Sequence, residues 1–156
     1  MSSKHFWCFA VATLLVISIT TRQSRAATAG DACSYLTPAQ ISAALGATVD
    51  AGVYVTPTFK RTCTWTIKGG GGFVTLFLSD LKQYEAGRHP PISAVVITPV
   101  SGLGDGAYFN AVGDNVGLIV KKGNVSFKVA AYIHAAPLSR KQAVERALAP
   151  QVLAGF

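Results

Sequence analysis

A short apolar run near the N-terminus decides how much of this 156-residue chain is left to fold. A basic start at Lys4 precedes the apolar run at 6–19, and polar and then small residues follow it, which is the layout of a secretory signal peptide. The run is shorter than the roughly 20 apolar residues of a membrane-spanning helix. We therefore expect residues 1–29 to be a cleaved signal peptide and residues 30–156 to form a single exported domain.

The end of the signal peptide has two candidate cleavage positions, after Ala26 and after Ala29. Cleavage after Ala29 is preferred because basic residues lie close before the first position. A lipid anchor is not expected, since a bacterial lipoprotein signal has a Leu-type residue three positions before its cysteine, and Gly30 stands there before Cys33. The predicted product is a soluble protein of the periplasm or the extracellular space, without a stable membrane span.

Charge excludes one class of partner. Cleavage lowers the net charge from +7 to +4, because it removes three basic residues and no acid. A nucleic-acid-binding domain has clustered Lys and Arg with interleaved aromatic residues, whereas the dense basic spots here are only 60–61 and 121–122. We expect no nucleic acid partner, and at most a weak attraction to anionic envelope surfaces.

The cysteines predict one disulfide bond. Cys8 lies in the signal peptide, which leaves Cys33 and Cys63 as an even pair in an exported chain. A redox pair of the Cys-x-x-Cys type is absent, and a zinc site needs four ligands at recognisable spacings. His89 and His134 do not stand at such spacings from the cysteines, so no metal or cofactor is expected.

Capping-box signals, in which a Ser or Thr is followed three residues later by Gln, occur near both ends of the predicted domain. They predict a helix after Thr37 that ends at Gly46. They also predict a C-terminal helix after Ser139 that ends or kinks at Pro150.

Alternating apolar and polar residues predict strands between these helices. The strand at 61–67 places Cys63 and Trp65 on its inner face, so the disulfide would pin the start of the first helix to the buried side of the sheet. Further strands are predicted at 73–78, 95–97, 116–121 and 125–133, a short helix at 80–87, and a tight Gly-rich turn at 101–106. The predicted fold class is α+β, an antiparallel sheet with the N-terminal and C-terminal helices packed on one face.

Several of these segments together resemble a diffuse group of small exported bacterial proteins and lipoproteins of unknown function. The resemblance rests on the motifs at 33–38, 44–46, 63–65, 102–108 and 120–127 and extends over nearly the whole predicted domain. It implies a bacterial source and an α+β fold similar to the PsbP-like fold of photosystem proteins. It brings no catalytic residues, and this chain lacks the lipid-attachment signal of the lipoprotein members.

Catalytic motifs are missing from the sequence. Asp105 lies between two glycines, where it is a ligand-binding carboxylate or, more simply, a turn residue that accepts from nearby amides. His89 and His134 are candidate general bases, but neither has a recognisable Ser or Cys partner. The aromatic residues at strand spacing are expected in the core rather than in a ligand cavity: Trp65, Phe73, Phe77 and Phe127.

These observations favour a non-enzymatic, exported binding or interaction module of the bacterial cell envelope, with a protein, an envelope component or a small apolar ligand as its partner. The alternative is a small periplasmic hydrolase or lyase that uses one of the two histidines with Asp105. A third hypothesis is a secreted inhibitor that presents the rigid loop at 88–91.

Overall fold

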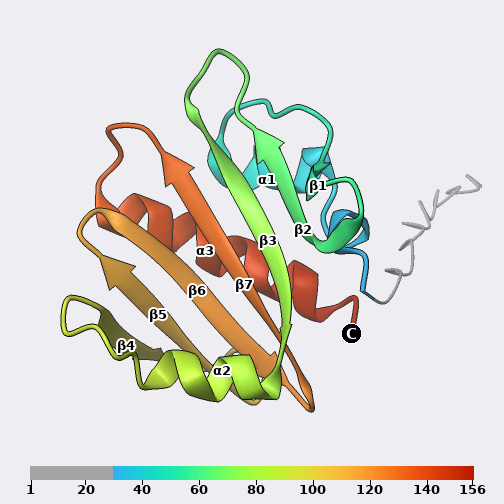
Figure 1. Cartoon of the computed structure of the whole chain (residues 1–156). Coiled ribbons are helices and arrows are strands. Elements are labelled where there is room, and N and C mark those ends of the chain that lie inside the picture. The colour runs from blue at the N-terminus through green and yellow to red at the C-terminus, as the bar shows by residue number, and fades with distance from the viewer. Residues whose placement is uncertain (1–29) are drawn as a thin grey trace, which may run out of the picture.

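Seven antiparallel strands form one sheet in the computed structural model, which describes residues 30–156 (Figure 1). The predicted signal peptide lies outside the described residues. The strands are β1 Val53–Thr56, β2 Phe59–Thr66, β3 Gly72–Asp80, β4 Val96–Val100, β5 Gly106–Val112, β6 Asn115–Lys122 and β7 Val125–Ile133.

The strand order is β1-β2-β3-β7-β6-β5-β4. The chain builds one half of the sheet, crosses to its far edge after β3, and returns through hairpins until β7 lies beside β3. An antiparallel α+β fold is therefore confirmed. The prediction missed β1, because this edge strand has four residues and three of them are exposed, so it has no alternating pattern to detect.

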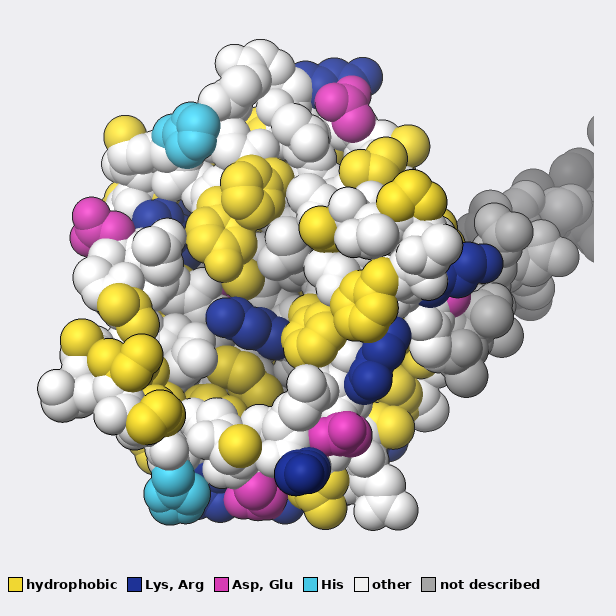
Figure 2. Space-filling view, in the orientation of Figure 1, with side chains coloured by type: hydrophobic (Ala, Val, Ile, Leu, Met, Phe, Trp, Pro, Cys, Tyr) yellow, Lys and Arg dark blue, Asp and Glu magenta, His cyan; other side chains and the backbone are white. Residues whose placement is uncertain are grey.

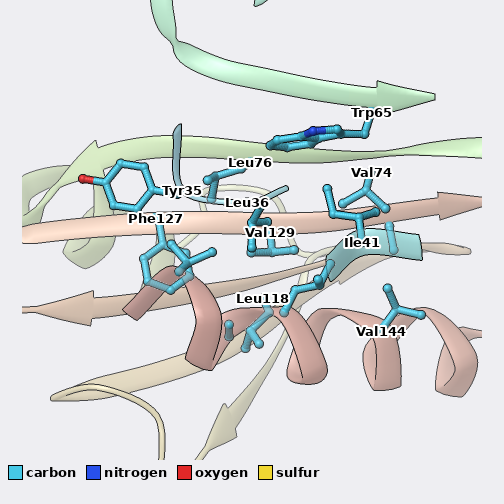
Figure 3. Close-up of a cluster of buried hydrophobic side chains, with 14 of the residues drawn as sticks. Tyr35, Leu36, Ile41, Trp65, Val74, Leu76, Leu118, Phe127, Val129 and Val144 are labelled. Carbon is cyan, nitrogen blue, oxygen red and sulfur yellow. The ribbon is translucent and has the colours of Figure 1, made fainter. Parts of the chain in front are cut away.

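Two helices contribute to the main hydrophobic core. Ile41 of α1 (Pro38–Leu45) and Val144 of α3 (Leu138–Leu153) are buried in the same cluster as Trp65 and Val129 of the sheet (Figure 3). The third helix, α2 (Leu81–Arg88), lies on the other side of the sheet, in front of it in Figure 1, whereas α3 lies behind. The main core lies between the sheet, α1 and α3, and α2 covers part of the other face.

The start of α1 follows its sequence signals closely. The Thr37 hydroxyl accepts from the Gln40 amide at 3.2 Å, and the Gln40 side chain accepts from the Thr37 amide at 2.7 Å. Gly46 ends the helix with a left-handed φ of 67°. The predicted capping box and helix end are both confirmed.

The predicted disulfide is present between Cys33 and Cys63, with a Cα–Cα distance of 5.1 Å. Cys33 belongs to a 3-10 turn, η1 (Ala32–Ser34), just before α1, and Cys63 is fully buried on the inner face of β2. The bond therefore ties the start of the described chain to the second strand of the sheet.

Two details of α3 differ from the prediction. The residue before its first turn is Pro137, no side chain caps it, and the predicted Ser139 cap does not form. The helix continues through Pro150 to Leu153 because Leu148, Ala149 and Val152 form one buried stripe across the proline. Burial of that stripe outweighs the backbone hydrogen bond that a proline removes.

The expected aromatic core is also only partly correct. Trp65 and Phe127 are buried, but Phe73 is 37% exposed and Phe77 is half-buried on the side of the sheet that carries α2. Among residues 30–156, no helix is long and apolar enough to cross a membrane.

Candidate functional site: the open face of the sheet

The side of the sheet that faces away from α1 and α3 is partly uncovered, and we call it the open face. Strand register arranges its side chains in three rows that run across the strands. α2 covers one end, where Tyr84 packs against Tyr108 with ring centroids 5.2 Å apart. The rows are Thr66–Phe73–Tyr132, Thr64–Thr75–Ala130 and Thr62–Phe77–Lys128–Ile119–Tyr108.

Two aromatic pairs border the middle of the open face. The ring centroids of Phe73 and Tyr132 are 4.7 Å apart, and those of Phe59 and Phe77 are 6.5 Å apart. Phe59 is 45% exposed, a large fraction for a residue of this kind in a strand. Figure 2 shows hydrophobic side chains gathered in separate clusters on this face, with a basic side chain near its middle.

Lys128 occupies the third row, opposite Phe77 on β3 and Ile119 on β6. Its aliphatic stem lies over Gly117, where a Cβ atom would overlap the Lys128 Cε. Glycine at this position therefore lets the lysine lie flat across β6. Burial lowers the pKa of the Lys128 ammonium, and the charge of Glu145 acts in the opposite direction.

Glu145 reaches the same region from the opposite side of the sheet. Pairing between β6 and β7 ends at Leu118 and Val129, and beyond this pair a gap opens between the two strands. Glu145 of α3 is 0% exposed, and its Oε1 accepts from the Ala131 amide of β7 at 2.9 Å. The carboxyl group thus occupies the place of a missing strand-to-strand hydrogen bond.

The second oxygen of Glu145, Oε2, is buried and has no hydrogen-bond partner in the described part of the chain. Burial raises the pKa of this carboxyl to about 8, against the opposing effects of the Ala131 amide, Lys128, Lys141 and the Leu118 amide. The Lys141 ammonium itself donates to the Asp114 carbonyl at 2.7 Å. Because Glu145 is mostly protonated at neutral pH, it leaves Lys128 without a full counter-charge.

Asp105 has a structural role in the described chain. Its Oδ2 accepts from the Gly123 amide at 2.7 Å, and its own amide donates to the Lys121 carbonyl at 2.9 Å. These bonds fasten the loop before β5 to the hairpin turn between β6 and β7. This is the turn interpretation of Gly-Asp-Gly.

The structure does not bring Asp105 and His134 together. Asp105 is bonded to the turn that precedes β7, whereas His134 follows the last residue of β7, and a strand of nine residues is about 30 Å long. His89 is an exposed residue at the C-terminal end of α2. Among residues 30–156, no group of three or more His, Cys, Asp or Glu side chains is arranged to hold a metal ion.

The sequence prediction missed Lys128 and Glu145 as a pair, although signals for each were present. Alternation in β7 placed Lys128 on the outward face, but an outward lysine is ordinary. Glu145 lies three and seven residues before Leu148 and Val152, on the apolar stripe of the C-terminal helix. A charged residue on such a stripe is the signal that would have found it.

A second concavity lies between α1 and α3. It is a groove of about 630 Å³ whose lining side chains include no titratable group. Its lining residues are Ala39, Gln40, Ala43, Pro150, Gln151 and Ala154. Because this groove has no charged side chain to recognise a ligand, the open face is the stronger candidate for a binding site.

Comparison of the chain with protein-family models, with curated proteins and with solved structures gave no match. The resemblance to small exported bacterial proteins therefore stays a prediction from the sequence motifs.

Proposed function

We propose that this protein is an exported, non-enzymatic binding module of the bacterial cell envelope, and that it binds its ligand on the open face of the sheet. The observation that carries this proposal is the uncovered arrangement of two aromatic pairs around Lys128. Exposed aromatic rings beside a partly desolvated cation are typical of recognition surfaces, because they release water at little cost in side-chain entropy.

Binding fits the geometry better than catalysis does. Among the carboxyl groups of residues 30–156, Glu145 has a raised pKa, which a general acid would need. However, Glu145 is fully buried behind β6 and β7, so a substrate on the open face does not contact it. The alternative of a hydrolase or lyase needs a histidine beside Asp105, and that carboxylate is already bonded to Gly123. The disulfide is compatible with export to an oxidising compartment.

The test is binding of the purified, disulfide-intact protein to a bacterial envelope fraction, followed by co-sedimentation. The variant Phe73→Ser/Tyr132→Ser removes one of the two aromatic pairs. The matched control, Ile92→Ser/Leu138→Ser, removes two hydrophobic side chains that are 62% and 36% exposed in a loop and at the start of α3. We expect the first variant to lose binding and the control to keep it, and equal binding by both would refute the proposal.

A further inference from the structure

The part of the open face between its two aromatic pairs has small side chains, and we call this part the trough. Phe73 and Phe77 lie four residues apart on β3, which corresponds to about 13 Å along the strand. Between these levels the floor is made of small side chains, those of Thr75, Ala130 and Gly117. The trough is therefore longer than one sugar ring and has aromatic rings at both ends.

The walls and floor of the trough combine two kinds of contact. Aromatic rings pack against the apolar C–H faces of pyranose rings, which are flat and of similar size. Threonine hydroxyls both donate and accept, as sugar hydroxyls do, and Thr62, Thr64 and Thr75 are half-buried on this face. An acyl chain, in contrast, is stabilised by an enclosed apolar cavity, and this face is open.

Charge limits the ligand further. Among the residues of the three rows, Lys128 is the one cationic side chain, and none is anionic. The next row on the same face contains Lys121, which is paired with Glu85 of α2 at 3.4 Å. One cation suits a ligand with isolated carboxylates, whereas a nucleic acid backbone with a phosphate at every step requires several. The stem of the lysine lies in the space left by Gly117.

The buried side of the site supports the same charge preference. Glu145 approaches the gap between β6 and β7 with an oxygen that lacks a partner, and it sits in surroundings that disfavour its ionised form. It therefore competes poorly for Lys128 with a carboxylate that arrives on the open face. The charged groups that face Glu145 are Lys128 from β7 and Lys141 from α3 itself.

We infer that the trough binds an acidic oligosaccharide, with sugar rings against the two aromatic pairs and a carboxylate at Lys128. The inference deepens the proposed function and rests on it. A peptidoglycan glycan strand freed of its peptides and a uronic acid polymer share this chemistry, since both are chains of pyranose rings with carboxylates.

The test uses two probes, soluble glycan strands stripped of their peptides and oligogalacturonate, each with a control in which the carboxylates are amidated. Binding is measured by calorimetry for the intact protein and for three variants: Lys128→Met, Phe73→Ser/Tyr132→Ser and the Ile92→Ser/Leu138→Ser control. Circular dichroism verifies that each variant is folded. We expect at least one carboxylated probe to bind, and its affinity to fall at least tenfold on amidation, in Lys128→Met and in the aromatic variant.

The outcomes separate this inference from the broader proposal. If the aromatic variant loses envelope binding but neither carboxylated probe binds the intact protein, the acidic sugar is wrong and the proposed function stands. If the aromatic variant keeps envelope binding, both are wrong. Binding that is equal for acidic and amidated probes, or unchanged in Lys128→Met, contradicts the role of the lysine. Self-association of the intact protein that the aromatic variant abolishes would assign the face to a second copy instead.

Discussion

The buried carboxyl of Glu145 makes the stability of this protein depend on pH in an unusual direction. Its pKa is raised from 4.5 to about 8 in the folded state, so between these values the folded protein binds a proton that the unfolded chain releases. The contribution of this group to stability is therefore largest below pH 4.5. It falls as the pH rises from 4.5 to about 8 and stays constant above that.

The magnitude follows from the size of the shift. Since one pKa unit corresponds to about 1.4 kcal/mol, the cost of burying the ionising carboxyl grows by about 4 kcal/mol between pH 5 and pH 9. Glu145→Gln keeps an oxygen that accepts from the Ala131 amide and cannot ionise. We expect the variant to gain about this amount relative to the unaltered protein across that pH range.

The assay is urea-induced unfolding at pH 5, 7 and 9, with the disulfide intact, for the unaltered protein and the Gln variant. The control is Asp50→Asn, since Asp50 forms an exposed ion pair with Lys68 and its loss should change stability by less than about 1 kcal/mol at every pH. If the difference between the unaltered protein and Glu145→Gln is the same at pH 5 and pH 9, the reasoning about the buried carboxyl is refuted.

Three further predictions concern the disulfide, the first helix cap and the space beside Lys128. Cys33→Ser/Cys63→Ser should lower the free energy of unfolding by about 3–4 kcal/mol, from loop-closure entropy over a separation of 30 residues, and an unchanged urea midpoint would contradict this. Thr37→Ala should cost about 1 kcal/mol in the same assay, while Thr37→Ser, which keeps the hydroxyl, should cost little. Gly117→Ala should change the free energy of unfolding by less than about 1 kcal/mol, because the new methyl group meets only the flexible end of the Lys128 side chain, which can move aside. A larger loss that Lys128→Ala recovers would show instead that the lysine stem is fixed over Gly117.

The sequence was most informative where local chemistry determines structure. The capping box at Thr37, the alternation around Trp65 and the pairing of Cys33 with Cys63 each depend on neighbouring residues or on the single available partner. The start of α3 was placed wrongly for a related reason. Ser139 is a good capping residue, but the backbone already closes its first turn on the Pro137 carbonyl.

The candidate site was not predictable in the same way, because its parts come together only through tertiary structure. Phe73 and Phe77 have the composition of core residues, and their exposure follows from α2 covering only one end of the sheet. Lys128 and Glu145 approach one gap from opposite faces, and that gap exists because the pairing of β6 with β7 does not extend beyond Leu118 and Val129. The residues of β6 and β7 themselves contain no sequence pattern that predicts where the two strands separate.

The most direct test of the binding surface is an NMR titration of the isotope-labelled, folded protein with the soluble, peptide-free glycan strands and with oligogalacturonate. We predict that amide shifts concentrate on β3, β6 and β7 around Thr75, Lys128 and Ala130, and that Lys128→Met reduces them. Shifts that concentrate instead on α1 and α3, around the groove between Ala43 and Pro150, would contradict the central claim that the open face is the binding site.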